Sequence, residues 1–209
     1  MAIQINGNGT ITGISVGGLP DGIVDTDMIA ANAVSSAKIA SGAAATGWTH
    51  QSYSAIGSGS SYTVSVPTTA TALRIGILGL SSNTGSSGSE SYAALRLGTS
   101  SGLVTSNYET VSSYLEDSYQ QVETWTSRAI LYPSNYGRAA HYFNGQIECW
   151  KLGNTNRWFI KSELSFGANE VHFFMQSNID LGASITQWSI FLNTGSFDGG
   201  SVGSSYYED

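Results

Sequence analysis

Apolar and polar side chains alternate along most of the chain beyond residue 48. In "SYTVSVP", "ALRIGILGL", "SYAALRLG", "NRWFIKSELSF" and "ITQWSIFLN", every second position is mostly apolar. This is the period of a β-strand with one buried face. The side chains predicted to point inward are Tyr62, Val64, Val66, Leu73, Ile75, Ile77, Ala93, Leu95, Leu97, Trp158, Ile160, Leu164, Phe166, Trp188, Ile190 and Leu192.

Runs of Gly, Ser, Asn and Pro separate these strands and predict turns. They read "SSNTGSSGS", "PSNYG", "LGNTN", "FGANE" and "NTGSFDGG". The pattern predicts about ten short strands, and no segment shows a convincing helical period. Residues 48–209 are therefore predicted to form one all-β domain, a β-sandwich of jelly-roll type.

The first 47 residues have a different pattern. Ile3 and Ile5 alternate with polar residues, "NGNG" is a strong turn signal, and "TITGISV" is again strand-like. These features predict a β-hairpin over residues 3–16, which is marginally stable alone and needs something to pack on. We expect residues 1–47 to form a stalk that is separate from the domain at 48–209.

Within this stalk, the segment "VDTDMIAANAVSSAKIASGAA" (24–44) repeats itself every ten residues. Thr26 and Ser36 are placed to cap short helices, but each copy is too short to be a stable helix and buries too little surface in a monomer. The segment is either a disordered tail or ordered by packing against copies of itself around a symmetry axis, as helices or as intertwined strands. The recurring isoleucines favour packing between copies. The predicted packing residues are Ile3, Ile5, Ile11, Ile14, Val24, Ile29, Val34 and Ile39.

Charge and composition exclude several classes of function. Only 11% of the residues are charged, and eight Lys and Arg against fifteen Asp and Glu give a formal net charge of −7. Because binding to nucleic acid needs a basic stripe, no nucleic-acid partner is expected. The N-terminus lacks a secretion signal, and no stretch approaches the ~20 apolar residues of a membrane span. We expect a protein made in the cytoplasm, neither secreted nor inserted in a membrane.

The sequence offers little catalytic chemistry. His50, His141 and His172 have no metal-ligand spacing, and Glu116 and Asp117 are neighbours that would point to opposite faces of a strand. The chain has neither a nucleophile elbow nor a phosphate-binding loop. We therefore expect no catalytic residue, no metal and no cofactor.

A single cysteine, Cys149, lies in the strand-like run "GQIECWKLG". One thiol cannot form a disulfide within the chain, so the fold does not depend on oxidation. We expect Cys149 to be a small buried residue rather than a reactive thiol.

Residues 104–158 are rich in aromatic and amide side chains. Aromatic rings can stack on the apolar faces of sugars while amides bind their hydroxyl groups, although the same residues also fill β-sandwich cores and loop tips. The turn "YPSNYGR" combines two tyrosines with Asn and Arg. Its residues Tyr132, Asn135, Tyr136 and Arg138 are predicted to contact a receptor.

Both ends of the chain resemble bacteriophage tail-fibre and virion-appendage proteins, including those of cyanophages. The stretch "GTITGISVGGLPDGIVDTDMIAANAVSSAKIA" is similar to their repeat stalks. The ending "ITQWSIFLNTGSFDGGSVGSSYYED" is similar to the last strands of fibre tips, with Phe197, Asp198 and Gly200 in an "FDAG"-like turn and Tyr207 and Glu208 at the end. Gly199 stands where that turn usually has Ala, and the strand "QWSIFLN" lacks the Arg often found there.

The resemblance implies a homotrimeric virion structural protein, a tail fibre. Residues 1–20 would bind the tail, the baseplate or another virion protein, and the β-sandwich heads would bind a host surface glycan or protein. Two alternatives stay open. One is a head fibre or capsid decoration protein, and the other is a polysaccharide depolymerase, for which a clear acidic pair is missing.

Overall fold

A computed structural model describes residues 4–5, 11–12, 47–83, 92–116, 119–132, 142–166 and 171–208 of the 209-residue chain. The chain divides into two units, residues 1–45 and 46–209. In the first unit, β1 (Gln4–Ile5) pairs with β2 (Ile11–Thr12) in antiparallel register, with Ile5 opposite Ile11. These strands lie on the two sides of "NGNG", as the predicted hairpin requires.

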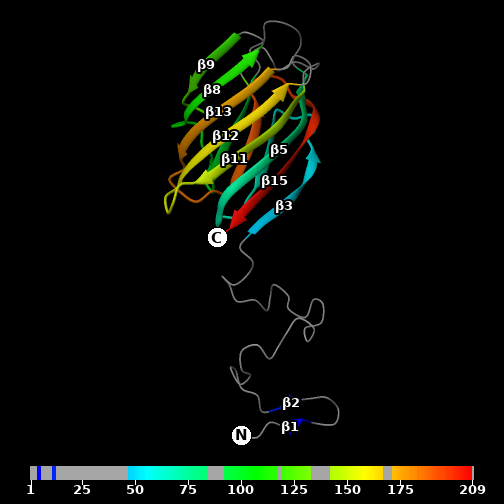
Figure 1. The fold of residues 1–209 in the computed structure, drawn as a ribbon, viewed down its shortest axis with the longest axis vertical. Coiled ribbons are helices and arrows are strands. Elements are labelled where there is room, and N and C mark those ends of the chain that lie inside the picture. The colour runs from blue at the N-terminus through cyan, green and yellow to red at the C-terminus, as the bar shows by residue number, and fades with distance from the viewer. Residues whose placement is uncertain are drawn as a thin grey trace. The chain divides into compact units, whose positions relative to one another are not determined.

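The second unit contains two antiparallel sheets (Figure 1). The large sheet has eight strands that lie side by side in the order β3-β15-β5-β11-β12-β13-β8-β9. Their bounds are β3 (Gly47–Ala55), β15 (Phe197–Glu208), β5 (Ala70–Ser82), β11 (Phe143–Lys151), β12 (Arg157–Phe166), β13 (Val171–Asp180), β8 (Glu109–Glu116) and β9 (Tyr119–Trp125).

The small sheet has the order β10-β6-β14-β4, and β7 pairs with β6 outside this path. Its strands are β10 (Ala129–Tyr132), β6 (Ala93–Thr99), β14 (Gln187–Leu192), β4 (Ser61–Ser65) and β7 (Gly102–Leu103). The part of the chain that the structure describes contains no helix. The predicted all-β sandwich is therefore confirmed.

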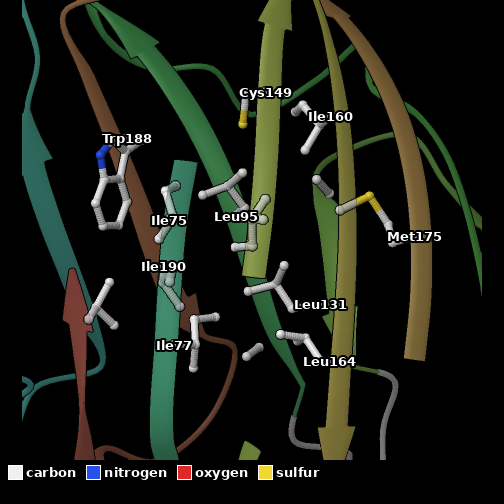
Figure 2. Close-up of a cluster of buried hydrophobic side chains, with 14 of the residues drawn as sticks. Ile75, Ile77, Leu95, Leu131, Cys149, Ile160, Leu164, Met175, Trp188 and Ile190 are labelled. Carbon is white, nitrogen blue, oxygen red and sulfur yellow. The ribbon is translucent and has the colours of Figure 1, made fainter. Parts of the chain in front are cut away.

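The core lies between the two sheets. Figure 2 shows side chains from both sheets meeting there, among them Ile75 of β5, Ile160 of β12, Leu95 of β6 and Trp188 of β14. Nearly all the side chains predicted to point inward are buried, while Tyr62 and Val64 are half-buried and pack against the core. Period-two alternation thus identified the buried face correctly, because burial of apolar side chains is the main force that orients a strand.

The turn predictions are only partly confirmed. "LGNTN" does connect β11 to β12. "NTGSFDGG" is a turn only up to residue 196, because β15 begins at Phe197, whose side chain is buried. Residues 84–91, 133–141 and 167–170 lie outside the described residues, and with them most of "SSNTGSSGS", "PSNYG" and "FGANE".

The strand number also exceeds the prediction, because the structure describes thirteen strands between residues 47 and 208. One of the additional strands is β3, "GWTHQSYSA", whose side chains are mostly exposed or half-buried. A strand at the edge of a sheet can be polar on both faces, so it leaves no alternating apolar pattern.

Candidate functional site

The outer face of the large sheet carries rows of side chains that run across the strands. Alternation along each strand places one set of residues in the core and the other on this face, as the burial pattern of β13 shows. One row passes through five adjacent strands in register: Gly203 of β15, Gly76 of β5, Gln146 of β11, Glu163 of β12 and Phe174 of β13.

A hollow of about 530 Å³ lies over this row. It is open to solvent on the side away from the core. Its lining residues are Tyr53, Gly76, Asn144, Gly145, Gln146, Glu163, Leu164, Ser165, His172 and Phe174. Most of these residues lie on β11, β12 and β13, and Tyr53 reaches in from the edge strand β3.

Tyr53 lies flat against the backbone of two neighbouring strands. A Cβ atom built on Gly203 would lie 2.7 Å from the Tyr53 ring, and one built on Gly76 would overlap the Tyr53 hydroxyl group. The ring can lie this close because both positions are glycine, an arrangement that also covers the weak point a glycine leaves in a strand. Tyr53 is still 58% exposed, so the opposite side of its ring faces solvent.

A β-bulge in β5, opposite the beginning of β11, shapes the base of the hollow. Two residues of β5 lie opposite the single residue Asn144 of β11, where the pairing shifts between Phe143 and Gly145, and Gly145 itself has a φ of 149°. Beside it, the Asn144 side-chain oxygen accepts a hydrogen bond of 2.8 Å from the backbone N–H of Gly79. A bulge of this kind redirects neighbouring side chains, and here it holds the Asn144 amide at the edge of the hollow.

The next row across the sheet is ionic. The Glu148 carboxylate lies 3.3 Å from Arg74 and 3.2 Å from Lys161, on the strands to either side of β11. The Arg74 guanidinium also lies 4.6 Å from the centre of the Trp48 ring. These contacts fix the charged side chains on the outer face, so Arg74 and Lys161 are partly neutralised by Glu148.

The hollow is suited to binding a polar ligand. Tyr53 and Phe174 offer exposed aromatic surface, while Gln146, Asn144 and Glu163 offer amide and carboxylate groups beside it. Aromatic surface with a few converging polar groups is the usual composition of a small-molecule or sugar site. Within the described residues, no three His, Cys, Asp or Glu side chains lie close enough together to hold a metal ion.

The structure corrects one predicted receptor contact. Tyr132 is only 1% exposed, and its ring stacks on Phe143 with the centroids 3.9 Å apart. It therefore belongs to the core and cannot contact a receptor from this position. Asn135, Tyr136 and Arg138 lie outside the described residues. The sequence pattern misled because Tyr132 adjoins a turn-like segment but ends the buried strand β10.

The other residues singled out from the sequence are placed as follows. Of the predicted stalk residues, Ile5 and Ile11 are partners in the antiparallel register of β1 and β2. Ile3, Ile14, Val24, Ile29, Val34 and Ile39 lie outside the described residues, as do His141 and Asp117. Glu116 is the last residue of β8.

Cys149 is fully buried, as expected, and burial raises the pKa of its thiol. His50 Nδ1 lies 2.7 Å from the Ser205 hydroxyl oxygen, and His172 stands on the outer face of β13 at the hollow.

None of the residues that line the hollow was predicted from the sequence to belong to a binding site. Tyr53 lies in a polar strand that the alternation pattern does not detect, and Gly76 and Gly203 are 127 residues apart in the chain. The one available signal was "TALRIGILGL", in which Gly76 takes an outward position between apolar residues. A glycine inside a strand pattern often marks the close approach of another group, which here is Tyr53.

Comparisons with known proteins do not extend this picture. No family model, no curated protein and no solved structure matches the chain. Among the described residues, no helix is long and apolar enough to cross a membrane.

Proposed function

We propose that the chain is a bacteriophage virion protein, a homotrimeric tail fibre whose β-sandwich heads adhere to a glycan on the host surface. The hollow on the large sheet is the observation that carries the adhesive part of this proposal. Its exposed Tyr53 and Phe174 can stack on sugar rings, and Gln146, Asn144 and Glu163 can bind their hydroxyl groups. The repeat and the two chain ends that resemble phage fibres support the virion part.

Binding is favoured over cleavage of the glycan. Hydrolysis of a glycosidic bond commonly uses two carboxyl groups, one on each side of the bond. Glu163 is the one carboxyl among the described residues that line the hollow. The other polar groups of the lining are the amides of Asn144 and Gln146, the hydroxyls of Tyr53 and Ser165 and the imidazole of His172. The amides and hydroxyls can bind sugar hydroxyl groups, and His172 does not supply the second carboxyl of the common mechanism. This composition supports an adhesin rather than a depolymerase.

A trimer would make a shallow and weak site useful. Three heads on one stalk can engage a repetitive glycan together, so that the second and third contacts form at a high effective concentration. The ten-residue repeat fits this arrangement, because three copies together could form the core that the alanines and isoleucines of one copy are too few to make. Residues 1–20 would remain to bind the tail or baseplate.

Two measurements test the virion role. Light scattering on the purified full-length chain should give about 66 kDa, three times 22.0 kDa. A variant that lacks residues 1–46 should give a monomer. In addition, mass spectrometry should detect the chain in purified virions of the phage that encodes it. Monomeric full-length protein argues against the trimer, and virions without the chain refute the virion role.

The position on the particle separates the fibre from its nearest alternative. Antibody labelling of intact virions against the head unit should mark the tail or baseplate in electron micrographs. Labelling on the capsid would instead identify a head fibre or decoration protein, and it would leave the adhesive role of the hollow intact.

A further inference from the structure

A second recess adjoins the hollow on the other side of Tyr53. It has a volume of about 360 Å³, and Tyr53, Gly76 and Gln146 line both spaces. Its own lining includes Arg74 of β5 and Ser205 of β15. Because the two recesses share these residues, they meet at the Tyr53 ring and form one extended depression.

The direction of the depression follows from the strand register. Gly203, Gly76, Gln146, Glu163 and Phe174 are opposite one another on five adjacent strands. Four inter-strand spacings of ~4.8 Å place the ends of this row roughly 19 Å apart. The depression therefore runs perpendicular to the strands, and it is longer than a single sugar ring.

The charges around the depression balance each other. Glu163 is negative, while Arg74 and Lys161 share the single negative charge of Glu148, so these four side chains sum to zero. The whole chain has a formal net charge of −7, which repels an anionic polymer at low ionic strength. The site therefore suits an uncharged ligand.

We infer that the ligand is a neutral oligosaccharide of two or more sugars that lies across the strands with one sugar stacked on Tyr53, rather than a single terminal sugar. This inference rests on the proposed adhesion to a glycan. The neighbouring sugars occupy the two recesses, one beside Gln146 and Glu163 and the other beside Arg74 and Ser205. Tyr53 forms the middle of the site because its buried side rests on Gly203 and Gly76.

The test uses surface polysaccharide from the bacterium that the phage infects. Partial hydrolysis and sizing give fragments of one to four sugars, and ion exchange separates neutral from acidic fragments. Each fraction is titrated against the full-length chain by calorimetry. We expect affinity to rise by about tenfold between one sugar and the longer fragments, and neutral fragments to bind in preference to acidic ones.

Two variants connect this behaviour to the depression. Tyr53→Ala should lower the affinity for the longer fragments by about tenfold, to the level of a single sugar. Leu152→Ala is the control, because Leu152 is exposed beyond the far end of β11 and does not line either recess. Urea denaturation of both variants checks that they are folded.

The outcomes are distinguishable. Single sugars that bind as tightly as tetrasaccharides, or a Tyr53→Ala variant with unchanged affinity, overturn the extended site and leave glycan adhesion standing. A preference for acidic fragments overturns the assignment of a neutral ligand. If no fragment and no intact polysaccharide binds, both this inference and the adhesive part of the proposed function are wrong.

Discussion

Tyr132 and Phe143 stack face to face inside the sandwich, with their ring centroids 3.9 Å apart and their planes 4° from parallel. Tyr132 ends β10 in the small sheet, and Phe143 begins β11 in the large one. The pair therefore joins the two sheets where the chain passes from one to the other. Phe143 also contacts Phe166 and Phe173, so the stack is part of an aromatic cluster.

Replacing Tyr132 tests this placement. Tyr132→Ala should lower the free energy of unfolding by about 3–5 kcal/mol, because it removes a fully buried ring and leaves a cavity. Tyr132→Phe keeps the ring and should cost less than about 1.5 kcal/mol. Urea denaturation measures both. If the Tyr132→Ala variant is as stable as the parent but no longer adheres to host cells, Tyr132 is a receptor contact and not a core residue.

Gly145, which lies on β11 opposite the bulge in β5, gives a second prediction. A methyl group on Gly145 would overlap the carbonyl oxygen of Glu163, and the φ of 149° is unfavourable for any other residue. Gly145→Ala should therefore lower the free energy of unfolding by about 1–3 kcal/mol or more.

Gly153→Ala is the matched control for Gly145→Ala. Gly153 has a φ of 60°, but a methyl group there would meet nothing within 4 Å. We expect the free energy of unfolding of this variant to fall by about 1 kcal/mol, because of backbone strain alone. Equal losses for the two variants would show that the packing of β11 against β12 does not require glycine.

High pH should destabilise the protein. Burial raises the pKa of the Tyr108 and Tyr132 hydroxyls and of the Cys149 thiol above their ordinary values. The unfolded chain therefore releases these protons at lower pH than the folded protein does. Below about pH 8.5 all three groups are protonated in both states, and their contribution to the free energy of unfolding is fully present. The free energy of unfolding falls as the pH rises above this value.

The slope of this loss is measurable. Each group lowers the free energy of unfolding by up to about 1.4 kcal/mol per pH unit once its unfolded form ionises. Urea denaturation from about pH 7 to 11 should show the decline beginning with the thiol. Cys149→Ala should delay its onset until the tyrosines ionise, near pH ~10. Stability that stays constant across this range would contradict the burial of these groups.

The glycines beneath Tyr53 give a prediction that separates binding from folding. Gly76→Ala places a methyl group where the Tyr53 hydroxyl lies, and the ring can move away because it is the end of an exposed side chain. The free energy of unfolding should change by less than about 1 kcal/mol. Glycan affinity should fall as it does for Tyr53→Ala, because the ring no longer lies flat. Unchanged affinity would mean that the position of the ring is unimportant.

Much of the fold was readable from the sequence because it depends on local patterns. Leu73, Ile75 and Ile77 alternate with polar or small residues, and the structure buries all three. The hairpin strands on the two sides of "NGNG" are also found. In both cases the signal lies within a few residues, where side-chain period and turn chemistry act directly.

The hollow was not readable because it depends on pairing between distant segments. Tyr53 is near Gly203 only because β3 pairs with β15, and Gly203 is near Gly76 only because β15 pairs with β5. No local pattern encodes this register. The burial of Tyr132 was missed for a related reason, since its partner Phe143 lies on the other sheet.

Binding of the full-length chain to host cells, compared with that of Tyr53→Ala, Phe174→Ala and Leu152→Ala, tests the central claim most directly. The claim is that the chain adheres through the hollow on its large sheet. The account predicts that Tyr53→Ala and Phe174→Ala each bind at least about tenfold more weakly than the parent, whereas Leu152→Ala binds equally well. Equal binding by the parent and all three folded variants would place adhesion on another surface.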